Sequence, residues 1–330
     1  MPARPKSAFP KPAAVLPGEA DVLANVLTDL SDHDAKRVYA DWLEEHGDKR
    51  GPLLRSFVAA HRAGKRFPAM KSAPPVWREL VGLTLMAQFR GTPLGPQTDR
   101  LLALARPALA CASEGAPEKA LAVGASKYGG RPDLPPGTKW PRFEGAPLAF
   151  IGQFNLAELH TSPVARELPG AGVLSVFAAH DEESGNDDFP KGSWRLFHFP
   201  EASQLARREF DADLPDESRF PSCRLWFTEW LTLPSEDSPW GEGLFTESEA
   251  ADAYADLYVD RTLGDHILGY PFPIQGDVLY KKTVRHLLTI GGNDDTGWEW
   301  GDGGALYFTL DEKHLKAGTF DRAMMEMDCG

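Results

Sequence analysis

One short segment near the C-terminus gathers several possible metal ligands. Asp294, Asp295, Glu299 and Asp302 fall close together there, and carboxylate oxygens are the ligands that Ca²⁺ and Mg²⁺ prefer. Their spacing does not follow the EF-hand pattern of alternating acids, a glycine and a distant glutamate. We therefore favour a solvated loop whose Asp and Asn side chains fix turns through local hydrogen bonds, with a divalent-ion site as the alternative.

Polar residues within apolar segments form a second set of candidates. Gln153, Gln275 and Asp277 lie inside or beside apolar runs, and a few placed polar groups in an apolar pocket orient a ligand. The competing interpretation is structural, with Gln153 bonded to irregular backbone and Asp277 in a turn. We favour the structural interpretation and keep these three residues as pocket candidates.

Tryptophans supply the third set of candidates. Trp298 and Trp300 flank Glu299, and they form either an aromatic patch that contacts a partner or part of the core, which we favour. Trp140, followed by Pro141, is in the same way either a wedge over one end of the core or a stacking platform. We favour the wedge.

The motifs of well-known catalytic and cofactor sites do not occur in this chain. There is no His-Glu-x-x-His, Gly-x-Ser-x-Gly or phosphate-loop motif. Gly170-x-Gly172 opens a predicted strand, whereas a nucleotide fingerprint opens a helix. We therefore expect no catalytic residues and no cofactor. Catalytic groups can also assemble from distant positions, so we favour a protein that is not an enzyme and keep an enzyme as the alternative.

The charge of the chain is strongly divided. Its net charge is −13, with 16 Lys+Arg against 11 Asp+Glu in residues 1–110 and 19 against 37 in residues 111–330. Such asymmetry indicates two modules. The excess of acidic residues disfavours binding to nucleic acid and to anionic membranes, because proteins bind both by neutralising phosphates. We expect a protein partner, and the acidic character of the chain suits a basic one.

The cysteines and the N-terminus indicate the compartment. The 3 cysteines are far apart and form no Cys-x-x-Cys, which favours reduced thiols over a disulfide framework. The first residues contain no apolar secretory core. We expect a soluble, cytoplasmic protein.

The hydrophobic pattern divides the chain into four parts. Residues 1–18 form a Pro-rich tail, 19–110 a helical module, 111–122 a linker, and 123–330 a β-rich domain. Thr246 and Glu249 have capping-box spacing before a helix in that domain. Runs of strands with few helices between them indicate an α+β fold that is largely antiparallel.

Two short segments of the β-rich domain resemble each other. Residues 149–153 lead past a loop to 172–177, and residues 288–292 lead to 304–308 with similar wording. A duplicated strand–loop–strand unit would explain this likeness.

Several blocks of the C-terminal part resemble a known family. They are Gly129-Gly-x-Pro132, Trp140-Pro141, Ile151-Gly-Gln-Phe154, residues 269–277 and residues 300–308. In this wording and order they resemble the YwqG-like family, to which no biochemical function is assigned. The resemblance covers about residues 123–330 and implies a compact α+β domain.

A second resemblance lies in the helical module. Residues 37–51, followed by Leu54-Arg55, resemble the short repeat-companion domain found near the N-terminus of many bacterial proteins, over about residues 19–65. This chain departs from that pattern at Pro52, where an acidic residue is usual.

Neither resemblance implies an activity. We expect a non-catalytic protein–protein interaction module, as an adaptor or an immunity-type protein that masks its partner. The alternative is a small-molecule or divalent-ion binding protein, or a hydrolase, with a pocket in the β-rich domain.

Overall fold

The N-terminal part of the protein is a bundle of short helices. The computed structural model describes residues 16–180 and 189–330, so the predicted tail lies almost wholly outside the described residues. Leu23, Val26 and Leu27 recur at helical spacing and are buried. The helices are α1 (Glu19–Thr28), α2 (His33–Glu45), α3 (Arg50–Arg62), α4 (Pro75–Leu80), α5 (Leu83–Phe89) and α6 (Thr98–Leu104).

A buried polar network contains several of the residues in 37–51 that carry the second family resemblance. Arg50 forms a bidentate ion pair with Glu19, at 2.8 and 3.0 Å. Tyr39 donates to the same carboxylate and accepts a 2.9 Å hydrogen bond from the Trp77 indole. Gly51 lets α3 approach α2, because a Cβ there would lie 2.6 Å from the Ala40 carbonyl oxygen. These contacts join α1, α2, α3 and α4 at one point.

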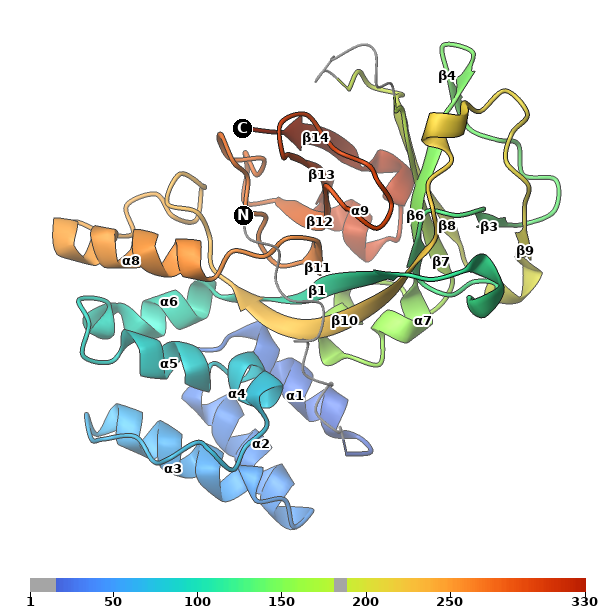
Figure 1. The fold of residues 1–330 in the computed structure, drawn as a ribbon. Coiled ribbons are helices and arrows are strands. Elements are labelled where there is room, and N and C mark those ends of the chain that lie inside the picture. The colour runs from blue at the N-terminus through green and yellow to red at the C-terminus, as the bar shows by residue number, and fades with distance from the viewer. Residues whose placement is uncertain (1–15, 181–188) are drawn as a thin grey trace.

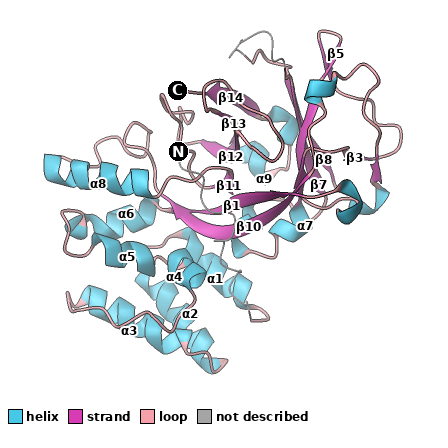
Figure 2. Cartoon of the chain, in the orientation of Figure 1, coloured by secondary structure: helices cyan, strands magenta, loops and turns pink. Residues whose placement is uncertain are grey.

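Within the described residues ten strands form one curved antiparallel sheet in the order β14-β13-β12-β11-β1-β10-β2-β6-β7-β8 (Figure 2). The fold is therefore α+β, as predicted. The strands are β1 (Arg106–Gly115), β2 (Lys127–Tyr128), β6 (Ala149–Asn155), β7 (Val173–Ala178), β8 (Trp194–Phe199), β10 (Cys223–Thr232), β11 (His266–Leu268), β12 (Val284–Gly291), β13 (Ala305–Asp311) and β14 (Met324–Asp328).

Strand β1 corrects the prediction that strands begin near residue 123 and that 111–122 is a linker. Its ten residues pair with β10 from Arg106↔Thr232 to Gly115↔Cys223, and its middle also pairs with β11. The sequence does not indicate this strand, because alanines dominate its centre and Ala is a poor strand former. Pro107 lies just outside the stretch that is paired on both sides.

Smaller elements flank the sheet. These are the pairs β3 (Asp133–Leu134) with β9 (Ala206–Arg207) and β4 (Arg142–Phe143) with β5 (Ala146–Pro147), the helices α7 (Leu156–Leu159), α8 (Ser248–Asp260) and α9 (Glu312–Lys316), and the 3₁₀ turns η1 (Gly95–Gln97), η2 (Glu118–Ala120), η3 (Pro163–Glu167), η4 (Ala202–Gln204), η5 (Asp216–Ser218) and η6 (Phe320–Arg322). The capping box predicted at Thr246 is wrong. Helix α8 begins two residues later, behind Glu247, which makes no side-chain capping bond.

The two ends of the sheet share a layout but not a register. Strands β6–β7–β8 and β12–β13–β14 are antiparallel meanders, each with an irregularity in its first pair. Gly152 pairs with Val176, whereas Gly291, its counterpart in the internal resemblance, pairs with Ala305. Ala305 corresponds to Val173 in that resemblance, so the pairings are offset. The internal duplication stays a hypothesis.

The helical bundle and the sheet share one hydrophobic core. A single cluster of buried residues extends from Leu23 in α1 to Met325 in β14, and the bundle lies against β1 and β10 (Figure 1). Glu79 of α4 forms a buried ion pair with Arg261, which follows α8. Arg261 also donates to the Leu231 carbonyl oxygen of β10 at 2.9 Å. The described helices include none that is both long and apolar enough to cross a membrane.

Replacing Glu79 by Gln tests how tightly the bundle is joined to the sheet. The substitution keeps the side-chain shape but leaves the buried Arg261 guanidinium without its counter-ion. We expect the free energy of unfolding to fall by about 3 kcal/mol in urea titration. Hydrogen exchange should accelerate in α4 and β10 together.

The matched control is Glu44→Gln, which removes an exposed carboxylate from Arg55 in the bundle. Exposed pairs contribute about 1 kcal/mol or less, so this variant should unfold almost as the parent protein does. Unfolding of the Glu79 variant in two separate steps would contradict the shared core.

Candidate functional site

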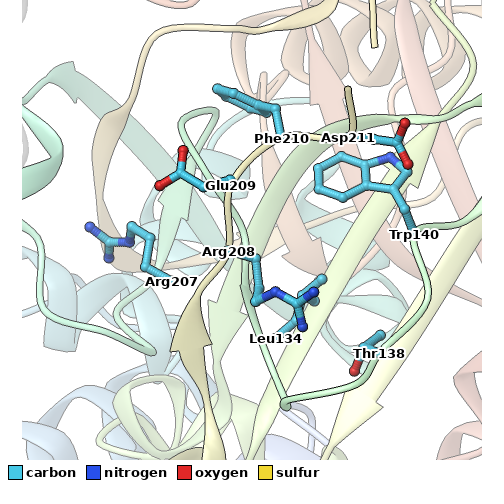
Figure 3. Close-up of a pocket in the computed structure, with 8 residues that line it drawn as sticks. All are labelled: Leu134, Thr138, Trp140, Arg207, Arg208, Glu209, Phe210 and Asp211. Atoms are coloured by element: carbon cyan, nitrogen blue, oxygen red, sulfur yellow. The ribbon is translucent and has the colours of Figure 1, made fainter. Parts of the chain in front are cut away.

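An open groove of about 490 Å³ lies at the corner of the β-rich part, beside the β3–β9 pair (Figure 3). One wall follows β3, and the other is the end of β9 and the extended residues after it. Its lining combines aromatic, cationic and acidic side chains: Leu134, Thr138, Trp140, Arg207, Arg208, Glu209, Phe210 and Asp211. Its volume falls in the range of about 300–1,000 Å³ that is typical of ligand sites.

Trp140 forms a fixed aromatic wall of this groove. Its indole nitrogen donates to the Leu148 carbonyl oxygen at 2.9 Å. Its ring packs edge-on against Phe177 of the core, with centroids 5.6 Å apart, and meets Phe210 at 6.5 Å. Trp140 therefore covers one end of a core cluster, as the wedge interpretation has it, and also lines a cavity. A ring held in this way contacts a ligand without losing rotamer freedom.

Two neighbouring arginines of the groove have different environments. Arg207 donates to Asp133 at 2.8 Å and to the Glu118 carbonyl oxygen at 2.8 Å. Among the described residues, the Arg208 guanidinium makes one long contact, 3.5 Å, with the Pro135 carbonyl oxygen. Figure 3 shows Arg207 directed away from Trp140 and Arg208 directed to the side of the groove where Trp140 and Thr138 lie. Successive side chains of an extended segment point to opposite faces, which explains the contrast.

The acids of the groove already have partners. Glu209 pairs with Arg131, and Asp211 accepts from Arg142 at 2.6 Å. Within the described parts of the chain, Arg208 is therefore the lining cation that has no carboxylate partner. The groove can hold an anionic group at Arg208 beside an aromatic and aliphatic surface.

A buried polar network supports the groove from below. The Asp133 carboxylate accepts hydrogen bonds from the Gly124 amide at 2.9 Å, from Gln153 at 2.8 Å and from Arg207 at 2.8 Å. The Lys127 ammonium lies 3.6 Å from the same carboxylate. Asp133, Lys127 and Gln153 are fully buried. The network thus fixes β9, and with it the direction in which Arg208 points.

Opposing effects set the ionisation of this network. Burial by itself would raise the pKa of Asp133, but the Arg207 hydrogen bond and the Lys127 charge outweigh burial, and the pKa is lowered. Burial lowers the pKa of Lys127 to about 8, although Asp133 opposes the shift. Both groups are charged at neutral pH, because the pKa of Asp133 lies below 7 and the pKa of Lys127 lies above it.

The predicted pocket residues lie in separate surroundings. Gln153 belongs to the network below the groove, where it bonds Asp133 and the Ala125 carbonyl oxygen. Gln275 is exposed, and its backbone N–H donates to the Asp328 carboxylate of β14 at 2.9 Å. Asp277 accepts from the Leu279 amide at 2.7 Å, in a turn. Among these three described residues, only Gln153 is connected to the groove, because it bonds Asp133, which in turn bonds the lining residue Arg207.

The predicted acidic segment forms turns. Asn293 accepts from the amides of Asp295, at 2.9 Å, and Thr296, at 3.2 Å, as the turn-fixing interpretation expects. Asp294, Glu299 and Asp302 are exposed and Asp295 is half-buried. Among the described residues these acids do not converge on a common point that would hold a cation.

Trp298 and Trp300 are core residues. Their exposed fractions are 2 % and 3 %, and their rings lie 6.0 Å apart, with Phe220 edge-on to Trp298. The aromatic patch for a partner is therefore corrected to core packing, because neither ring reaches the surface. The sequence patterns did not indicate Arg208 or Phe210 as groove residues, because a charged run after a short strand gives no local signal of a groove.

The fold is α+β, with an open groove beside the β3–β9 pair. Residues 126–329 match a domain of unknown function, DUF1963. This match covers more than half of the chain, and the protein belongs to that family. No curated protein matches the chain. Strand β1 precedes the matched residues although it lies in the middle of the sheet.

Replacing Asp133 by Asn tests the support of the groove. Removal of the charge leaves the buried Lys127 and the half-buried Arg207 without their shared counter-ion, which we expect to cost about 3 kcal/mol of unfolding free energy at pH 7. The pKa of Asp133 is lower in the folded state, so its stabilisation is complete above the unfolded value of about 4. That stabilisation is lost as pH falls through the folded value.

The difference between variant and parent should therefore shrink as the pH falls from about 5 towards 3. Urea unfolding across this range measures it. Asp294→Asn, at an exposed acid, serves as the control and should have little effect at any pH. A deficit of Asp133→Asn that grows between pH 5 and pH 3 would contradict the assignment.

Proposed function

We propose that this protein is a non-catalytic recognition module whose groove beside β3 and β9 holds a segment of a protein partner. The observation that carries the proposal is Arg208, a groove cation without a carboxylate partner among the described residues, beside the fixed ring of Trp140. The segment that fits carries a carboxylate for Arg208 and an apolar side chain for Trp140 and Leu134.

The charge around the groove supports such a segment on an otherwise acidic surface. Residues 131–147 and 205–219 together contain six Lys or Arg and seven Asp or Glu, so the local balance is close to neutral. A carboxylate meets little repulsion there. The acidic surface elsewhere favours a partner that is basic as a whole, because complementary charge speeds encounter.

The lining chemistry favours binding over catalysis. The groove residues include no His, Cys or Ser, and its acids are held by arginines. Nucleophilic catalysis needs a nucleophile with an adjacent base. The groove volume also suits a small anionic molecule, which is the alternative function.

The finer family identities belong to the same proposal. We propose that the matched region is of the YwqG-like type and that α1–α3 are a repeat-companion domain, on the wording quoted above. An adaptor or immunity-type role is consistent with a bundle that is firmly attached to a binding domain.

Selection from a random peptide display library, with the whole protein as bait, tests the proposed function. We expect enriched peptides to combine an Asp or Glu with a neighbouring apolar residue. Synthetic copies should bind Arg208→Gln at least about tenfold more weakly, because a charge-assisted hydrogen bond contributes about 1.5–3 kcal/mol. Thr138→Trp, which fills the groove, should also abolish binding.

Arg322→Gln is the matched control, since it removes an exposed arginine from another part of the sheet domain. It should bind the peptides as the parent protein does. Enrichment of basic peptides that bind both groove variants unchanged would overturn the proposal. A thermal shift caused by small carboxylates or phosphates and lost in Arg208→Gln would favour the small-molecule alternative.

A further inference from the structure

Three metal-ligating side chains meet in the helical bundle, outside the groove and outside the matched family region. His33 is the first residue of α2, His61 lies in the last turn of α3, and Asp99 lies in the first turn of α6. One ligand atom from each residue lies within 4.8 Å of the other two. The bundle brings them together from positions far apart in sequence.

The distances resemble those within a first coordination shell. Asp99 Oδ1 lies 2.9 Å from His61 Nε2 and 3.3 Å from His33 Nε2. The two imidazole rings have centroids 5.2 Å apart and are tilted by 60°. A tetrahedral zinc ion has nitrogen and oxygen ligands at about 2.0–2.2 Å, so its ligand atoms are separated by slightly more than 3 Å. Only a small movement would bring the three atoms onto one ion.

His33 provides an independent indication that a ligand is needed. Both of its ring nitrogens are buried and have no hydrogen-bond partner among the described residues. The 3.3 Å approach to Asp99 is close but lacks hydrogen-bond geometry. Buried polar side-chain atoms normally have a partner, and an exception calls for an explanation such as a water or an ion.

We propose that His33, His61 and Asp99 bind a divalent transition-metal ion, with Zn²⁺ as the best chemical fit. Imidazole nitrogens suit zinc and its neighbours, whereas Mg²⁺ and Ca²⁺ prefer a full set of oxygen ligands. Each ring would bind through Nε2 and keep its proton on Nδ1, and the ion would replace the hydrogen bond between His61 and Asp99. Three protein ligands leave one position for water or for a group from outside.

The surroundings permit access to the site but limit its affinity. The exposed side-chain fractions are 15 % for His33, 18 % for His61 and 59 % for Asp99, so an ion can enter from solvent. The ammonium of Lys36, held by the Leu30 carbonyl oxygen, and the guanidinium of Arg62 both act on His33 electrostatically. These two cations oppose an incoming cation, so we expect weaker binding than at a comparable site without them.

Titration of the full-length, metal-free protein with ZnCl₂ tests the site, followed by CoCl₂, whose absorption in the visible range reports geometry and ligand type. We expect a single Zn²⁺ per chain, a rise in melting temperature on binding, and a cobalt spectrum typical of nitrogen and oxygen ligands. His33→Ala and His61→Ala should each weaken binding by at least about tenfold, because even outer-shell changes cost about 10–100-fold.

Two further variants keep the test decisive. Asp99→Asn alters an exposed side chain and should fold normally while binding more weakly. His46→Ala removes an exposed histidine directly after α2, the helix that His33 begins, and should leave binding unchanged. Absence of zinc binding by the parent protein would overturn the proposal. So would full binding by the double variant His33→Ala/His61→Ala, since the ion would then lie elsewhere and the three side chains would be only a hydrogen-bonded cluster.

Discussion

The pairing of β1 with β10 is the constraint on which the rest of the structure depends. It runs over ten residues in the middle of the sheet. Strand β1 follows directly from α6 of the bundle, and β10 leads on through β2 to the groove side of the sheet. One ladder therefore fixes the helical bundle, both meanders and the β3–β9 corner relative to one another. The shared hydrophobic core then buries the faces that this ladder brings together.

Buried ion pairs act at the junctions between these parts. Glu19 with Arg50 joins helices within the bundle, Glu79 with Arg261 joins the bundle to β10, and Asp133 with Arg207 joins β3 to β9. Such pairs add little net stability relative to apolar packing, but they are costly to break because an unpaired buried charge remains. They are therefore suited to fix relative positions. Arg208 and the His33 cluster differ from them, since their polar groups lack a complete set of partners within the described chain, and this is why they carry the functional proposals.

Local sequence signals predicted the regular elements well and the special positions poorly. The helical pattern that begins at residue 19 and the strand pattern of residues 123–330 correctly indicated the bundle and the strands after it, because periodicity reports which side of an element is buried. The same reasoning missed β1, whose small residues carry no such signal. The favoured interpretation of Trp298 and Trp300 as core residues is correct, and the partner-contact alternative is wrong. Arg208 looked like any surface charge, and His33, His61 and Asp99 lie on three different helices.

The sequence by itself determined the α+β class, the helical start of the chain, the acidic character of the later part and its family resemblance. These properties depend on composition, short-range periodicity and wording, all of which can be read along the chain. Only the tertiary structure decided that β1 belongs in the middle of the sheet, that Gln153 supports a groove through Asp133, and that two histidines and an aspartate converge. Each of these facts depends on contacts between residues far apart in sequence, and such contacts exist only after the whole core has closed.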